Sequence, residues 1–182
     1  MKTSAVLTCA ALAGLALTAL TVADDKPAAK SGSAAAFDGL KKLVGEWCNA
    51  DKEGKDGKPT GPVMTVLKLT ANGTVLHETL FPGTGHEMVS VYHLDGDDLV
   101  CTHYFSLGNQ PRLKLEAGKD GKTLAFKSVS LSNGKSMNDM HMGSARITLI
   151  DDDHYRAEWN ALKDGKPVDG HKAMFNMARK AK

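Results

Sequence analysis

The sequence predicts an all-β fold, an antiparallel up-and-down barrel of about ten strands with one short N-terminal helix. Asn-Gly and Asp-Gly pairs recur along the chain, and they favour tight hairpin turns because both residues accept positive φ. Between these pairs, short runs alternate apolar and polar residues, which is typical of strands with one buried and one wet face. The pairs lie at 56–57, 72–73, 95–96, 120–121, 133–134, 164–165 and 169–170.

The helix is expected at residues 37–44, where Phe37, Leu40 and Val44 share one helical face. No helical pattern follows any of the later strands, which excludes a parallel β-α-β architecture. A meander of antiparallel strands closes most economically into a barrel, because closure removes exposed edges. The expected strands are 45–51, 62–71, 74–81, 87–94, 98–106, 111–117, 122–131, 138–150, 154–162 and 170–179.

Length and composition indicate a single domain with an ordinary core. The chain has 182 residues, of which 42% are hydrophobic and 24% charged, with a formal net charge of +2. Such a balanced composition lacks the excess of basic residues that is typical of nucleic-acid-binding proteins, so we expect no nucleic-acid partner. A small-molecule ligand is the partner we expect, and the oligomeric state is left open.

The N-terminus has the pattern of an export signal. Residues 1–23 combine one early charge, Lys2, with an apolar run and small residues up to Ala23, as in a secretory signal peptide. A transmembrane anchor is the competing interpretation, because the apolar run is about 20 residues long. We expect cleavage, a periplasmic or secreted protein, and no stable membrane insertion. Residues 24–36 read as a flexible linker, and residues 37–182 as the barrel domain.

Two cysteines, Cys48 and Cys101, remain after cleavage of the signal. A pair in an exported protein suggests a disulfide. However, the first and fifth strands of a ten-stranded barrel lie across it, too far apart for the Cα separation of about 5.5 Å that a bridge needs. We therefore expect two free thiols.

Several segments resemble known barrels. Gly45-Glu46-Trp47, at the start of the first expected strand, is similar to the opening signature of lipocalin-like (calycin) barrels, in which the Trp packs across the closed end. Nearly the whole mature chain resembles an uncharacterised family of exported bacterial lipocalin-like proteins. That resemblance implies a lipocalin-like barrel and assigns no reaction. Its segments are 79–88, 92–97, 102–104, 108–112, 146–159 and 178–180.

A more distant resemblance is to nitrobindin-like barrels, which hold haem through a His near the C-terminus. The resemblance implies haem as a cofactor, with His171 as its axial ligand. His171 shares its expected inward face with Ala173 and Phe175. The alternative is a buried His that hydrogen-bonds a neighbouring strand. Those relatives also extend the G-x-W motif with glycines, where this chain has Cys48-Asn49-Ala50.

A polar group of residues gathers near one mouth of the expected barrel. A turn at residues 95–98 pairs Ser90 with His103, and His141 lies in phase with inward-facing residues of a later strand. Such residues can hold the polar head of a ligand, orient a catalytic water, or only close the rim through hydrogen bonds. The ligand-binding candidates are His86, His103, Tyr104, Asn109, Gln110, Arg112 and His141.

Sequence signatures of the common enzyme and metal classes are missing. Neither H-E-x-x-H nor G-x-S-x-G occurs, so we assign no catalytic residue and no metal site. The first hypothesis is an exported, non-enzymatic protein that binds a small, mostly apolar molecule. The alternatives are a haem-binding barrel using His171, and a small barrel enzyme using His86, His103 and Tyr104.

Overall fold

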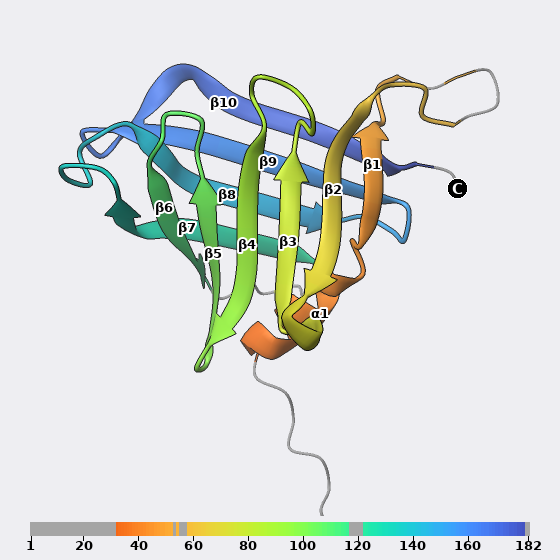
Figure 1. The fold of residues 1–182 in the computed structure, drawn as a ribbon, viewed down its shortest axis with the longest axis horizontal. Coiled ribbons are helices and arrows are strands. Elements are labelled where there is room, and N and C mark those ends of the chain that lie inside the picture. Colours follow the sequence, from red (N-terminus) through yellow and green to blue (C-terminus); the bar gives the residue numbers. More distant parts are fainter. Residues whose placement is uncertain (1–31, 53, 55–57, 117–121, 181–182) are drawn as a thin grey trace, which may run out of the picture.

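The computed structural model describes residues 32–52, 54, 58–116 and 122–180, and shows a closed antiparallel barrel of ten strands (Figure 1). Each strand pairs with its neighbour in sequence, and β1 pairs with β10 to close the sheet. This confirms the predicted fold class. The elements are α1 (Gly32–Lys41), β1 (Gly45–Asn49), β2 (Val63–Thr70), η1 (Ala71–Gly73), β3 (Val75–Leu80), β4 (Met88–Asp95), β5 (Asp98–Tyr104), β6 (Gln110–Glu116), β7 (Thr123–Ser132), β8 (His141–Leu149), β9 (His154–Lys163) and β10 (Lys166–Arg179).

The strands begin and end close to their expected positions, with two informative differences. β10 starts at Lys166, because the tight turn uses Asp164 and Gly165, both at positive φ. The expected turn at 169–170 lies instead within β10, where the register with β9 shifts between Pro167 and Lys172. The Asp-Gly pair there accommodates an irregularity within the strand rather than reversing the chain.

At the N-terminal side, α1 begins at Gly32, so part of the expected linker is helical. The proposed signal peptide and residues 24–31 lie outside the described residues. Within the part of the chain that the structure describes, no helix is long and apolar enough to cross a membrane.

The two ends of the barrel differ. Figure 1 shows α1 beside the β2–β3 and β4–β5 turns, and its buried Phe37 and Leu40 belong to the hydrophobic core. We call this the closed end. The opposite end, which we call the open end, includes the loops 81–87, 105–109 and 133–140 and the β9–β10 turn.

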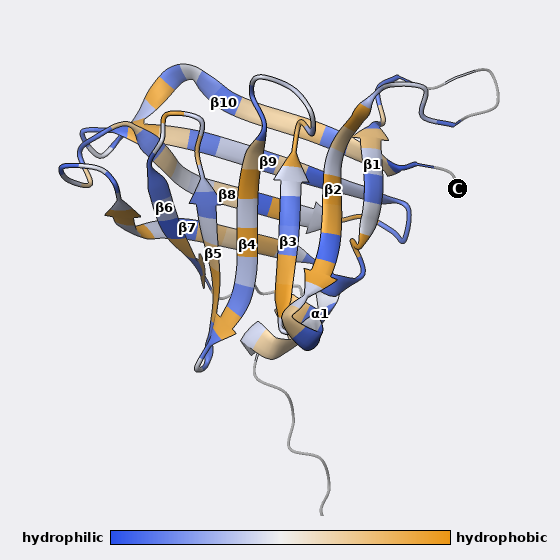
Figure 2. Ribbon diagram, in the orientation of Figure 1, coloured by the Kyte–Doolittle hydropathy of each residue, from blue (hydrophilic) through white to orange (hydrophobic). Residues whose placement is uncertain are grey.

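Apolar and polar residues alternate along the strands, as the hydropathy colouring shows (Figure 2). Alternate side chains therefore meet inside the barrel and form a single core. Towards the closed end this core is densely aromatic: the rings of Trp47 and Tyr155 pack edge to face with their centroids 4.7 Å apart. Trp47 thus occupies the place that its G-x-W motif implies, although three residues of sequence identify no family.

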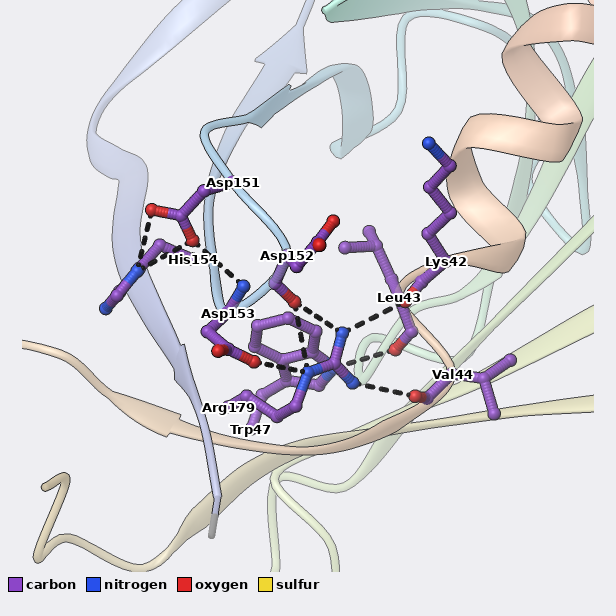
Figure 3. A network of polar contacts seen from close by, with 9 residues as sticks. All are labelled: Lys42, Leu43, Val44, Trp47, Asp151, Asp152, Asp153, His154 and Arg179. Carbon is purple, nitrogen blue, oxygen red and sulfur yellow. Dashed lines mark hydrogen bonds and ion pairs between the residues drawn. The ribbon is translucent and has the colours of Figure 1, made fainter.

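Arg179, at the end of β10, fastens the closed end (Figure 3). Its guanidinium lies over the Trp47 ring, 4.2 Å from the ring centroid, and donates to the carbonyls of Lys42 and Val44 at 3.0 and 2.9 Å. It also donates to the Asp152 carbonyl at 2.7 Å. Gly45 is required beside it: its φ is +139°, and a Cβ there would lie 2.9 Å from an Arg179 nitrogen.

The two described cysteines, Cys48 and Cys101, are both free and buried, which confirms the prediction of free thiols. Cys101 lies in the core. Cys48 pairs with Ala178 of β10 and is buried, although it directly follows the inward-facing Trp47 and strict alternation would turn it outward. The register between β1 and β2 shifts between Trp47 and Cys48, so simple alternation does not extend through this point.

Candidate functional site

Three polar side chains form a row inside the barrel. Glu78 on β3 lies opposite Ser90 on β4, and Ser90 lies opposite His103 on β5. The pairing of Ser90 with His103 is the one that the turn at 95–98 predicts. These residues are only 4%, 0% and 1% exposed, respectively, because each occupies an inward position of an alternating strand. Polar groups this deeply buried need hydrogen-bond partners from the protein or from a ligand.

Hydrogen bonds connect this row. The Tyr92 hydroxyl donates to Glu78 Oε2 at 2.8 Å, and Ser90, directly opposite Glu78 on β4, faces the same carboxyl group and acts to lower its pKa. Ser90 Oγ lies 3.0 Å from His103 Nδ1. A continuous polar chain therefore runs from Glu78 through Ser90 to the imidazole of His103.

Burial controls the ionisation of these groups. It raises the pKa of Glu78, although the hydrogen bonds from Tyr92 and Ser90 act in the opposite direction. It lowers the pKa of His103 to about 4, because the charged imidazolium is disfavoured away from water. His103 is therefore a neutral imidazole near pH 7, with one protonated and one bare ring nitrogen.

A cavity of about 60 Å³ lies against His103, near the open end. His103 Nε2 is buried and has no hydrogen-bond partner among the described residues. The imidazole ring lies 4.6 Å, centroid to centroid, from the indole of Trp159 with the planes 34° apart. His103 is the polar group of a lining that is otherwise apolar or aromatic: Leu80, Phe81, Met88, Met142, Trp159, Ala173 and Phe175.

An aromatic pair borders the cavity, with Phe81 packed edge to face on Phe175 at a centroid distance of 5.7 Å. Phe81 has a φ of +51°, which is strained for a bulky residue. A tight turn holds it there: Gly83 also has positive φ, and Thr84 donates to the Phe81 carbonyl through its backbone N–H and its hydroxyl. The strain at Phe81 therefore coincides with the edge of the cavity.

A larger recess of about 450 Å³ lies on the outside, between α1 and the β8–β9 turn. Its lining includes several charged side chains, among them Asp38, Lys42 and Asp151. It contains none of the buried polar groups that lack a partner. We therefore take the smaller interior cavity as the candidate site.

Of the expected polar cluster at the mouth, His103 alone borders the cavity. His86 is exposed in the β3–β4 loop, and Tyr104 is 49% exposed because it follows the inward-facing His103 on β5. Gln110 donates to the Gly108 carbonyl, and Arg112 pairs with Asp95. The structure does not bring His86, His103 and Tyr104 together in the way that acid–base catalysis needs.

Asn109 and His141 are buried, and their side chains hydrogen-bond main-chain carbonyls in the loops of the open end. Asn109 Nδ2 donates to the Met140 carbonyl at 2.8 Å. His141 places Nδ1 2.7 Å from the Asp139 carbonyl and Nε2 3.2 Å from Ser128 Oγ. His141 faces inward, as its phase predicts, yet both of its ring nitrogens already have partners.

The residues present do not fit haem. His171 is exposed on β10 and does not line the cavity, whereas its sequence phase predicts an inward position. His171 itself lies in the segment between Pro167 and Lys172, where the register with β9 shifts and regular alternation is interrupted. A cavity of about 60 Å³ is also far smaller than a porphyrin needs, since an engineered protein cavity of about 150 Å³ holds a molecule only as large as benzene.

Sequence reasoning overlooked most of the site. Glu78 was detectable, because it lies between Leu76 and Leu80 on one apolar face of its strand. Ser90 was noted only as the partner of His103. Phe81 and Trp159 line the cavity together with residues that are distant in sequence, and the alternation of apolar and polar residues does not predict these contacts.

No family model and no curated protein matches this chain. The closed ten-stranded barrel is compatible with a lipocalin-like fold. Among the described residues, no three His, Cys, Asp or Glu side chains are arranged to hold a metal ion. The function therefore has to be argued from the cavity and its polar chain.

Proposed function

We propose that this protein is an exported, non-enzymatic, lipocalin-like binding protein that holds a small, mostly apolar molecule at the open end of its barrel. The observation that supports this most directly is the buried Nε2 of His103, which lacks a partner and borders an apolar cavity. A buried polar group without a partner costs about 1–3 kcal/mol, so a ligand that satisfies it gains binding energy. The ligand is therefore apolar except for one polar group.

The dimensions of the cavity limit what enters it. About 60 Å³ accommodates the polar head of a ligand and little more. The apolar remainder then extends past Phe81 and Phe175 to the open end. Met88 and Met142 also border the cavity, and their unbranched side chains adapt readily to different shapes.

Acetophenone is a suitable probe, because it combines one carbonyl with a small apolar body. Trp159 lines the cavity, so binding is expected to quench its fluorescence, and this signal disappears in Trp159→Phe. We expect saturable binding that weakens about tenfold or more in His103→Leu, which corresponds to 1.4 kcal/mol or more. Tyr104→Phe changes the adjacent outward-facing residue and should leave the affinity unchanged.

Two results would contradict the proposal. One is the absence of saturable binding for acetophenone and for 1-phenylethanol, which has the same skeleton with a hydroxyl. The other is equal affinity in wild type and His103→Leu, when circular dichroism shows both to be folded.

Export has a separate test, since it rests on residues 1–23. The full chain, expressed in a bacterium with a secretion system, is fractionated and its intact mass measured. Cleavage after Ala23 leaves a mature chain that starts at Asp24 in the exported fraction. A full-length chain in the membrane fraction would support the anchor interpretation instead.

A further inference from the structure

The polar chain inside the barrel has two ends with different surroundings. At one end, the Glu78 carboxyl group is held by Tyr92 and Ser90. At the other end, His103 Nε2 borders the cavity. Ser90 lies between them and has a single hydroxyl hydrogen, which it can donate in only one direction. The direction of that hydrogen bond links the two ends.

Two proton arrangements satisfy the chain. If Glu78 is ionised, Ser90 donates to the carboxylate, His103 Nδ1–H donates to Ser90 Oγ, and Nε2 presents a bare lone pair. If Glu78 is neutral, its O–H donates to Ser90 Oγ, Ser90 donates to His103 Nδ1, and Nε2 carries the hydrogen. The first arrangement offers the cavity an acceptor, and the second offers it a donor.

The surroundings of Glu78 favour the neutral arrangement. The titratable groups that interact with it are Tyr92 on β4, Cys101 on β5 and Tyr155 on β9. Burial raises the pKa of each of these three groups, so all are neutral near pH 7. No cation is among the groups that shift the pKa of Glu78, and desolvation is the largest cause of its rise. An isolated carboxylate in such a place is costly, and a neutral carboxyl group is not.

We propose that neutral Glu78, acting through Ser90, fixes the imidazole proton of His103 on Nε2, so that the cavity selects ligands whose polar group is a hydrogen-bond acceptor, such as a carbonyl oxygen. Glu78 is then a positioning residue that sets ligand specificity without touching the ligand. The selectivity rests on the proposed binding function. The position of the proton does not, because it belongs to the protein alone.

The proton position is measured directly by ¹⁵N NMR of the full chain labelled at histidine. In a neutral imidazole the protonated and bare nitrogens resonate far apart, and the His103 signals are assigned as those missing in His103→Leu. We expect protonated Nε2 and bare Nδ1 at the low end of the pH range in which the protein stays folded, with the proton moving to Nδ1 as Glu78 ionises at higher pH.

Three variants separate a proton relay from a purely structural role. In Glu78→Gln the amide N–H₂ donates to Ser90 as the neutral carboxyl does, so Nε2 stays protonated at every pH in this range. In Ser90→Ala the connection is broken and the pH response disappears. Tyr92→Phe removes the other hydrogen bond to Glu78 without changing the relay, so the response is kept, with the midpoint moved to higher pH.

Ligand selectivity is tested with the same protein and two probes. Acetophenone has only an acceptor, so its affinity falls about tenfold or more as Glu78 ionises. The hydroxyl of 1-phenylethanol both donates and accepts, so its affinity changes little over the same pH range. In Glu78→Gln, both probes bind independently of pH.

Several results would overturn the inference. A proton on Nδ1 throughout the pH range would do so, as would an unaltered pH response in Glu78→Gln or Ser90→Ala. Equal pH dependence for the two probes would refute the selectivity. If neither probe binds while the proton moves as expected, the binding function and its selectivity fail, and the relay stands as a property of the interior alone.

Discussion

Replacing Arg179 by Met tests how the closed end is held together. Met keeps an unbranched side chain over the Trp47 ring but removes the charge and every hydrogen bond of the guanidinium. The wild-type side chain donates to main-chain carbonyls in two separate segments, the α1–β1 connection at Lys42 and Val44 and the β8–β9 turn at Asp152. The substitution therefore releases both segments from the end of β10 at once.

The expected cost follows from these contacts. A hydrogen bond from a charged donor contributes about 1.5–3 kcal/mol when buried, and a cation–π contact about 0.5–1 kcal/mol at an exposed site. The Arg179 side chain is 29% exposed, so water replaces part of what is lost. We expect the free energy of unfolding to fall by about 3 kcal/mol, which lowers Tm by about 6–12 °C in a domain of this size.

Urea unfolding followed by circular dichroism measures this change, with Arg112→Met as the matched control. Among the described residues Arg112 pairs only with Asp95, whose side chain is 63% exposed, so its loss is expected to cost less than about 1 kcal/mol. Equal urea midpoints for the two variants, at equal slopes, would refute the view that Arg179 fastens the closed end.

Three other predictions concern the interior. The folded pKa of His103 is about 4 against an ordinary 6.5, so the unfolded chain binds the extra proton as pH falls between these values. The free energy of unfolding therefore decreases by about 3 kcal/mol over that window. Urea unfolding of wild type and His103→Leu at pH 7 and near pH 4.5 measures this loss, which we expect in wild type only. Stability that falls equally with pH in both proteins would contradict this. In a Cys9→Ser background, Cys48 and Cys101 should react with a thiol reagent only after addition of urea, because both are buried and burial raises both pKa values; rapid labelling of the native protein would disprove it. Gly143→Ala would place a methyl group against the Leu162 side chain and should destabilise by about 1–3 kcal/mol, with partial recovery when Leu162→Ala is added; a variant as stable as wild type would show that Leu162 moves aside freely.

The fold was predictable because its signals are local. Hairpin turns such as Asn72-Gly73 and strands such as 154–162 carry their patterns within a few residues of sequence. The pairing of Ser90 with His103 followed from one short turn by counting residues. Because each strand pairs with the next strand along the chain, the strand order of the barrel follows directly from the sequence order.

The candidate site was less predictable, because register irregularities and distant strands decide it. Alternation places His171 inward, and the shift in β10 leaves it exposed. Similarly, Tyr104 and Arg112 looked like partners of His103 only while the inward face of their strands was unknown. The cavity combines residues from β3, β4, β5, β8, β9 and β10, and no local pattern connects Phe81 to Phe175 or His103 to Trp159.

The pairing of β1 with β10 has a consequence for the folding kinetics. Every other pair of strands in the barrel joins sequence neighbours, so these pairs can form early and one after another. The last pair joins residues about 130 positions apart, so its formation completes the ring only after the intervening chain has been ordered. We therefore expect contacts at this junction, including Lys180 with Glu46 at 2.8 Å, to form after the transition state. Weakening them should accelerate the opening of the ring and leave the rate of its assembly almost unchanged.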